Sequence, residues 1–179
     1  GCMVDSCRSC DQCHKGEEQF CRRGMTVTYN GKDRQTGETT FGGYSGAIVV
    51  REEFVLRLTQ GLDPARAGPI LCAGITTWSP LKRWNVGPGS RIAIAGLGGL
   101  GHMGVKLAVA LGADVTVITT SEKKRDDALA LGASKVLISK DKDAMRAARG
   151  TFDFILDTIP VPHDLSPYLL LLDVDGSLV

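Results

Sequence analysis

The second half of the chain, from Arg91 to Val179, alternates short aliphatic runs with segments of helical composition. The aliphatic runs are RIAIAG, DVTVITT, KVLIS, TFDFILDTI and a terminal SLV, and Gly112, Gly132 and Gly150 close three of the helical segments. Parallel strands need crossovers, and helices supply them, so this alternation predicts a parallel sheet. Near-continuous aliphatic strands indicate helices on both faces. We expect an α/β, doubly wound fold whose sheet stops within its fifth strand.

The turn after the first of these strands carries a G-x-G-x-x-G motif between a strand and a helix. In that setting Gly96 permits a tight turn, Gly98 lets a pyrophosphate approach the backbone, and Gly101 lets helix and strand pack closely. The helix amino end adds unpaired N–H groups. The motif predicts a Rossmann dinucleotide site formed by Gly96, Leu97, Gly98, Gly99, Leu100 and Gly101. The alternative is that these glycines serve only a tight turn. His102, just inside the helix, is interpreted as packed or solvated.

The end of the second strand favours NADP over NAD. An NAD site places a carboxylate there for the ribose 2′-hydroxyl, whereas this chain has hydroxyl residues followed by three cations. Hydroxyl donors and positive charge suit a 2′-phosphate. The predicted contacts are Thr119, Thr120, Ser121, Glu122, Lys123 and Lys124. The alternative is that Ser121 caps a helix while the lysines face water. Glu122 falls in the first helical turn, where its charge suits the helix dipole.

Four cysteines near the amino end, Cys7, Cys10, Cys13 and Cys21, form a C-x2-C-x2-C-x7-C run. This spacing lets four thiolates surround one tetrahedral zinc ion, with Gly16 helping the chain loop back. Four thiolates leave no open position, so we expect a structural site. Alternatives are a disulfide cluster, an iron–sulfur cluster and a zinc module that binds nucleic acid. The absence of a signal sequence, the missing C-x3-C-P segment and a net charge of +1 disfavour them in turn. Cys2 and His14 are interpreted as bystanders.

Residues 1–43 show no apolar periodicity and read as a loop held by metal. Two β-branched and aromatic runs, Ala47 to Val50 and Phe54 to Leu58, predict strands of a small β domain, and Ile70 to Trp84 predicts a joining helix. The predicted domains are therefore 1–69 and 70–179. Near-neutral charge argues against nucleic acid or an anionic membrane as partner, and no apolar run is long enough to span a bilayer. We expect a cytoplasmic protein. The start at Gly1 and the stop after SLV indicate an internal fragment of a longer protein.

These motifs, with LCAGIT at 71–76, GLGGLGHMG at 96–104, TTSEKKR at 119–125 and FDFILDTIPVPH at 152–163, resemble zinc-dependent medium-chain alcohol dehydrogenases. The chain is most similar to the cinnamyl alcohol dehydrogenase-like branch, which includes NADP-dependent aldehyde reductases. The resemblance implies part of a GroES-like β domain, followed by the Rossmann domain. It implies zinc at structural and catalytic sites, a small alcohol or aldehyde as substrate, and a homodimeric full-length protein.

The resemblance also assigns residues outside the motifs described so far. It implies that Cys72 is a ligand of the catalytic zinc, that Thr76 contacts the nicotinamide side of the cofactor and that Thr158 is another NADP contact. The two other catalytic-zinc ligands of the family are absent from this sequence, so we expect the 179 residues alone to be inactive. Alternatives are a non-catalytic NADP-binding module and a relative of zinc-free quinone reductases, although that branch lacks the four-cysteine loop.

Overall fold

The computed structural model describes residues 1–179, which form two compact units, Gly1–Pro64 and Ala65–Val179. The domain boundary predicted between residues 69 and 70 lies a few residues after the boundary between these two units. The assignment of the two parts to a catalytic and a cofactor-binding domain stays a prediction. No helix is both long and apolar enough to cross a membrane.

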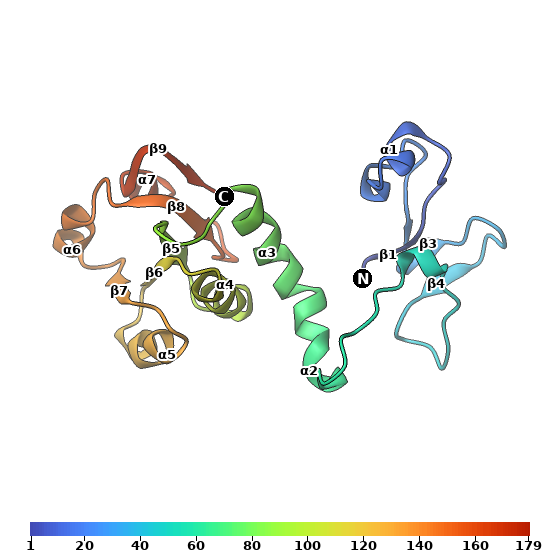
Figure 1. Ribbon diagram of the computed structural model, residues 1–179, viewed down its shortest axis with the longest axis horizontal. Helices are drawn as coiled ribbons and strands as arrows, with labels where there is room; N and C mark the ends of the chain where they lie inside the picture. The colour runs from blue at the N-terminus through green and yellow to red at the C-terminus, as the bar shows by residue number, and fades with distance from the viewer. The chain divides into compact units, whose positions relative to one another are not determined.

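The first unit contains two antiparallel pairs of short strands (Figure 1). β1 (Met3–Asp5) pairs with β2 (Thr26–Val27), and β3 (Tyr29–Lys32) pairs with β4 (Thr39–Phe41). The helical turns are α1 (Asp11–His14), η1 (Glu18–Phe20) and η2 (Glu52–Phe54). The expectation that residues 1–43 form only a loop is therefore wrong in part, because strands of two to four residues show no apolar alternation in the sequence.

The two strands predicted in the first unit are not formed. Residues 47–50 and 55–58 have no regular secondary structure, and the turn η2 occupies 52–54. Val49 is 99% exposed and Leu56 is 74% exposed. A strand needs a neighbour to accept and donate its backbone hydrogen bonds, and no segment of this chain pairs with these runs. Their β-branched composition was therefore a misleading signal.

The first unit also lacks an apolar core. Its buried side chains are those of Cys13 and Cys21 together with polar residues such as Asp5, Ser6 and Thr28. Both hydrophobic clusters of the protein draw only on residues 81–178. Packing therefore contributes little to the stability of the first unit.

α2 (Pro64–Ala67) crosses the boundary into the second unit, where η3 (Gly68–Leu71) leads into α3 (Ala73–Arg83). The predicted helix from Ile70 to Trp84 is thus present in most of its length. The sheet follows, with five parallel strands: β5 (Arg91–Ala95), β6 (Asp114–Thr119), β7 (Lys135–Ile138), β8 (Phe152–Asp157) and β9 (Leu172–Leu178). Their order is β7-β6-β5-β8-β9, which is typical of the doubly wound fold that the sequence predicts.

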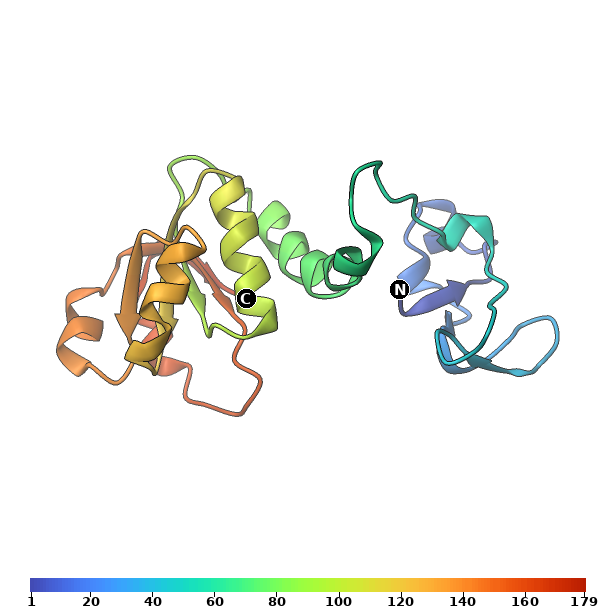
Figure 2. The same cartoon turned by 90° about the horizontal axis from the view of Figure 1, so that it is seen from below.

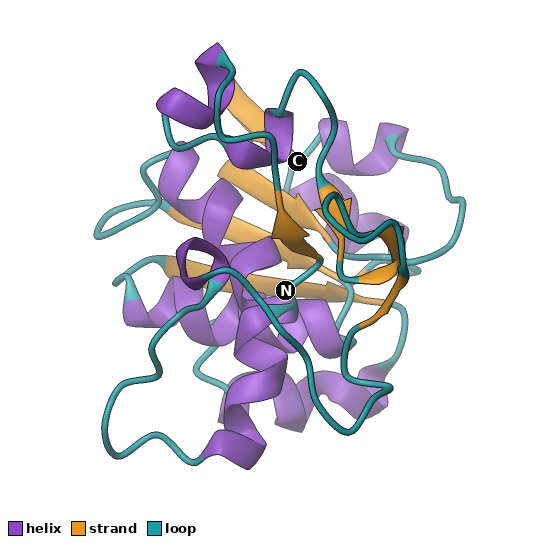
Figure 3. Ribbon diagram, turned by 90° about the vertical axis from the view of Figure 1, so that its right-hand side faces the viewer, coloured by secondary structure: helices purple, strands orange, loops and turns teal.

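Helices cover both faces of this sheet (Figures 1 and 2), and Figure 3 distinguishes them in purple from the strands in orange. One cluster joins the sheet to α3, α4 (Gly99–Ala110) and α5 (Arg125–Ala130), the latter preceded by η4 (Glu122–Lys124). The other cluster joins the opposite face to α6 (Lys142–Ala147) and α7 (Ser166–Leu169). Gly112, Gly132 and Gly150 take positive φ angles beyond three of the helices, as predicted.

The fifth strand begins at Leu172, earlier than the predicted SLV segment. Its register with β8 shifts between Phe152 and Phe154, and Asp175 within it has a φ of 62°. This part of the strand was not predicted, because its DVDG sequence is charged and lacks an aliphatic run. At the amino edge of the sheet, the Arg91 guanidinium on β5 binds the carboxylates of Asp153 on β8 and Asp173 on β9. One side chain therefore ties three adjacent strands together.

Candidate functional site

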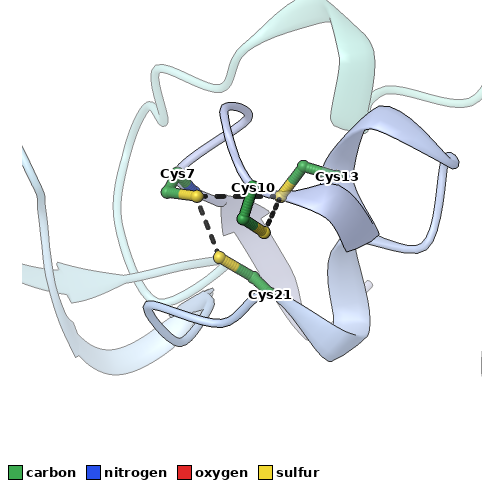
Figure 4. A group of neighbouring side chains, drawn as sticks. All are labelled: Cys7, Cys10, Cys13 and Cys21. Carbon is green, nitrogen blue, oxygen red and sulfur yellow. Dashed lines mark hydrogen bonds between the residues drawn. The ribbon is translucent and has the colours of Figure 1, made fainter.

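The four predicted zinc ligands converge in the first unit (Figure 4). All four sulfur atoms lie within 4.8 Å of one another, and the Cys13 sulfur is 3.5 Å from that of Cys10 and 4.0 Å from that of Cys7. A tetrahedron with Zn–S bonds of about 2.3 Å requires sulfur separations of about 3.8 Å. None of the cysteines forms a disulfide. The cluster therefore has the size and the donor set for one zinc ion.

The surroundings of the cluster favour thiolates. Backbone N–H groups of Cys7 and Arg22 point at the sulfurs of Cys21 and Cys10, each at 3.4 Å. The Ser9 backbone N–H lowers the pKa of Cys7 to about 5, and the Cys13 N–H lowers that of Cys10. At Cys13 the Ser6 hydroxyl lowers the pKa, but burial and the neighbouring thiols outweigh it and raise the pKa. Negative charge concentrated in this way calls for a cation.

The glycine loop of the second unit is held tightly at two of its glycines. Gly96 has a φ of 88°, which favours glycine. A Cβ atom on Gly101 would lie 2.1 Å from the Gly96 carbonyl oxygen, so only glycine lets α4 start this close to β5. A Cβ on Gly98 would meet no protein atom within 4 Å, and its φ of −103° suits any residue. The protein itself does not require glycine at position 98, whereas a ligand approaching the backbone there would.

The amino end of α4 opens into a cavity of about 860 Å³ within the second unit. No side chain caps this helix, so its first N–H groups lack intrahelical partners. Gly98, Gly99 and Leu100 line the cavity beside them. Uncapped helix N–H groups and the positive end of the helix dipole form a binding site for an anion such as a pyrophosphate.

The residues that follow β6 give this cavity its charge. Thr119, Thr120 and Lys124 line it, and Lys124 is the one charged side chain in the lining. The Lys124 ammonium also donates a 2.9 Å hydrogen bond to the Leu97 carbonyl of the glycine loop. Ser121 makes no capping hydrogen bond, so capping does not explain its position.

Glu122 does not bring negative charge to the cavity. It is absent from the lining, and its carboxylate pairs with Arg125, whose hydrogen bonds lower the pKa of Glu122. Arg125 is therefore occupied as well, which leaves Lys123 and Lys124 as the uncompensated cations of this segment. Lys123 is exposed and lies outside the lining.

Cys72 lies at the amino end of α3 and lines the same cavity as the glycine loop. Its carbonyl accepts hydrogen bonds from the Thr76 N–H at 3.1 Å and the Thr76 hydroxyl at 2.8 Å, which turns Thr76 toward that end of the helix. The four-cysteine cluster is the one group in the chain where three or more ligands converge. Cys72 is thus the one thiol that lines this cavity, and it belongs to no group of three or more metal ligands.

The structure brings most of the predicted site residues to one cavity. The lining includes Cys72, Thr76, Gly96, Leu97, Gly98, Gly99, Leu100, Thr119, Thr120, Lys124 and Thr158. Outside it are Gly101, Ser121, Glu122 and Lys123. Sequence reasoning missed Ser139 and Tyr168, which also line the cavity. Ser139 directly follows β7 and could have been found, since ligands bind beyond the carboxyl ends of parallel strands. Tyr168, on α7, has no comparable signal.

Comparisons with known proteins agree with this geometry. Residues 99–179 match the zinc-binding dehydrogenase family. Over its whole length the chain is 56% identical to NADP-dependent alcohol dehydrogenase C of Mycobacterium bovis, of which it covers 51%. The chain spans about half the length of the curated relatives it matches.

Solved structures of alcohol dehydrogenases resemble the chain over almost its whole length. A cinnamyl alcohol dehydrogenase from Sorghum bicolor superposes with a TM-score of 0.91 at 45% identity, covering 99% of this chain and 51% of that one. The cinnamyl alcohol dehydrogenase of Helicobacter pylori, complexed with NADP(H), gives 0.87 at 41% identity, covering 99% and 50%. Residues 99–179 thus form a domain of the zinc-binding dehydrogenase family, and the chain is a homologue of NADP-dependent alcohol dehydrogenases and cinnamyl alcohol dehydrogenases.

Proposed function

We propose that the chain supplies the NADP site and the structural zinc loop of an alcohol dehydrogenase or aldehyde reductase. The observation that carries the proposal is the charge of the cavity. Its lining has one ammonium group, that of Lys124, and no carboxylate, and the uncapped end of α4 opens into it. A cavity of this kind favours a ligand with several phosphates, and the missing carboxylate favours a 2′-phosphate over a ribose diol.

Each group has a distinct part in the proposed reaction. The N–H groups of the glycine loop and α4 bind the pyrophosphate, while Lys124 with the hydroxyls of Thr119 and Thr120 holds the 2′-phosphate. Thr76, fixed on the Cys72 carbonyl, orients the nicotinamide end. When bound, NADPH would supply a hydride for the aldehyde carbon, and a zinc ion would supply the charge that polarises the aldehyde oxygen. Cys72 would be one ligand of that ion.

The NADP preference can be tested by titrating the zinc-loaded chain with NADPH and NADH and following nucleotide fluorescence. We expect NADPH to bind at least about tenfold more tightly, because charge-assisted hydrogen bonds to the 2′-phosphate are lost with NADH. Lys124→Met should remove most of this preference and leave NADH binding nearly unchanged. Lys106→Met, on the exposed face of α4, is the matched control. Equal or tighter binding of NADH would contradict the NADP assignment.

The redox activity needs a separate measurement. Steady-state reduction of an aldehyde panel by the natural gene product that carries this sequence would separate an enzyme from a non-catalytic NADP-binding module. Because Cys72 is the one thiol at the cavity, we expect the 179-residue chain to bind NADPH without turnover. Zinc-dependent alcohol oxidation by the chain alone would refute this expectation. A cytoplasmic location and homodimerisation belong to the same proposal, and the free thiols support a reducing compartment.

A further inference from the structure

Thr158 follows β8 at the carboxyl edge of the sheet, beside the glycine loop. Its backbone N–H donates a 2.9 Å hydrogen bond to the Ala95 carbonyl. Its hydroxyl lies 2.8 Å from the Ala95 carbonyl oxygen and 3.2 Å from that of Gly96. The hydroxyl hydrogen therefore lies between these two carbonyl oxygens, of which the Ala95 oxygen is the nearer acceptor.

The same hydroxyl limits the space around two glycines of the loop. A Cβ atom would lie 3.1 Å from the Thr158 oxygen if placed on Gly96, and 3.0 Å if placed on Gly101. Side-chain atoms rarely approach this closely without displacement of a neighbour. The oxygen therefore fills the gap where the loop turns from β5 into α4, and the course of the loop depends on it.

A hydroxyl has one hydrogen to donate. Both oxygens nearest the Thr158 hydroxyl are carbonyl acceptors, so this hydrogen is used within the protein. Thr158 lines the cavity, but its donor capacity is directed at the loop instead of a ligand.

We propose that Thr158 is a positioning residue, which holds the Ala95 and Gly96 carbonyls so that the N–H groups of the glycine loop and α4 face the pyrophosphate. The inference rests on the proposed dinucleotide binding. It differs from the contact role that the family resemblance implied for Thr158. A contact residue would act on the part of the cofactor it touches, whereas a positioning residue acts on every ligand that carries the pyrophosphate.

The test compares three variants of the zinc-loaded chain. Thr158→Val keeps the shape of the side chain and removes the donor, and Thr158→Ser keeps the donor. Thr77→Val is the matched control, because the Thr77 hydroxyl also bonds two carbonyls, those of Ala73 at 2.8 Å and Gly74 at 3.1 Å. Thr77 is buried in α3 and does not line the cavity.

Dissociation constants for NADPH, NADH and ADP-ribose are measured by titration, together with the thermal unfolding midpoint. ADP-ribose retains the pyrophosphate and lacks the nicotinamide. Thr158→Val should weaken all three ligands by about the same factor, on the order of tenfold, which is the upper range for one hydrogen bond. Thr158→Ser should restore affinity to within about twofold of the wild type. Thr77→Val should lower the unfolding midpoint and leave all three affinities unchanged.

The contrary outcomes are distinct. If the wild type binds these ligands and Thr158→Val binds them equally well, the positioning role is wrong and the proposed function stands. If Thr158→Val weakens NADPH and NADH but not ADP-ribose, Thr158 acts at the nicotinamide and the positioning role is again wrong. A wild-type chain that binds none of the three overturns the proposed function and this inference with it.

Discussion

Single glycines of the nucleotide loop differ in what they do for the fold. Gly101→Ala would place a Cβ 2.1 Å from the Gly96 carbonyl oxygen, so we expect a loss of about 1–3 kcal/mol in the free energy of unfolding and weaker NADPH binding. The Cβ added by Gly98→Ala would meet no protein atom within 4 Å. The free energy of unfolding should therefore change by less than about 0.5 kcal/mol, while NADPH binding weakens. Denaturant unfolding and NADPH titration of both variants check this contrast. Gly98→Ala with wild-type affinity would contradict close approach of the pyrophosphate at that position.

The roles of single cysteines can be distinguished in the same way. Cys21 is buried within the four-sulfur cluster, whereas Cys2 is exposed and belongs to no group of ligands. Cys21→Ser should lose the tightly bound zinc and broaden the unfolding of residues 1–64, because a structural site needs all four donors. Cys2→Ser should retain wild-type zinc. Elemental analysis after gel filtration, with circular dichroism melting, measures both effects. Retention of one zinc ion by Cys21→Ser would show that the cluster is not the metal site.

At the residue scale, the sequence predicted those cavity residues whose side-chain chemistry and position after a strand both indicate a nucleotide site. The glycine loop and Lys124 were found because a motif sat between a strand and a helix. The use of the Thr158 hydroxyl within the protein was not predictable, because it depends on how β8 lies beside β5. The pairing of Glu122 with Arg125 was equally hidden, although it decides how many cations remain free.

At the element scale, the first four strands of the parallel sheet were predicted because each is an aliphatic run bounded by helical sequence, whereas only the SLV end of β9 was predicted. The runs Ala47 to Val50 and Phe54 to Leu58 have similar composition but form no strand. The difference lies in the neighbours: β5 is paired on both sides by β6 and β8, whereas those runs find no partner in this chain. Pairing is a tertiary property, so composition predicts a strand only when the sheet around it is also predicted.

The Arg91 bridge across β5, β8 and β9 should make the sheet sensitive to acid. Arg91 lowers the pKa values of Asp153 and Asp173 from the usual 3.8. In the folded protein these groups bind fewer protons than when unfolded, so their contribution is complete above about pH 4 and lost as pH falls through the lowered values. Arg91→Met should therefore lower the thermal midpoint at pH 6, with a difference from wild type that narrows toward pH 3. Because the three side chains are 40–44% exposed, the shift should be modest.

The control for this experiment is Arg146→Met, which removes an exposed ion pair with Asp143 within α6. It ties no strands together, so its effect on the midpoint should be small. Melting curves followed by circular dichroism from pH 6 to pH 3 provide the comparison. A difference between Arg91→Met and wild type that stays constant over this range would contradict the proposed origin of the acid sensitivity.

At the scale of the whole molecule, the two compact units are stabilised by different means. The second unit has two hydrophobic clusters, one on each face of its sheet. The first buries two cysteines and several polar side chains but no aliphatic or aromatic one. Removal of zinc by a chelator should therefore abolish amide protection in residues 1–64 and preserve it in the strands of residues 91–178.

Hydrogen exchange measured by mass spectrometry, with and without chelator, tests this difference peptide by peptide. Re-addition of zinc should restore protection in the first unit, and magnesium, which prefers oxygen ligands, should not. Protection that persists in residues 1–64 without metal would mean that hydrogen bonding and the short strands suffice to fold them. Loss of protection in both units would mean that the second unit does not keep its fold by its own core.

Because the first unit has no apolar core, its folded fraction and its degradation should depend on the free zinc concentration. If zinc alone holds it together, mass action ties its folded fraction to the free zinc concentration: above the dissociation constant, each tenfold fall in free zinc lowers the ratio of folded to unfolded molecules about tenfold. A cell short of zinc would then expose residues 1–64 to proteases while the second unit could still bind nucleotide. The amount of intact protein would then depend on the zinc supply of the cell as well as on the rate of synthesis.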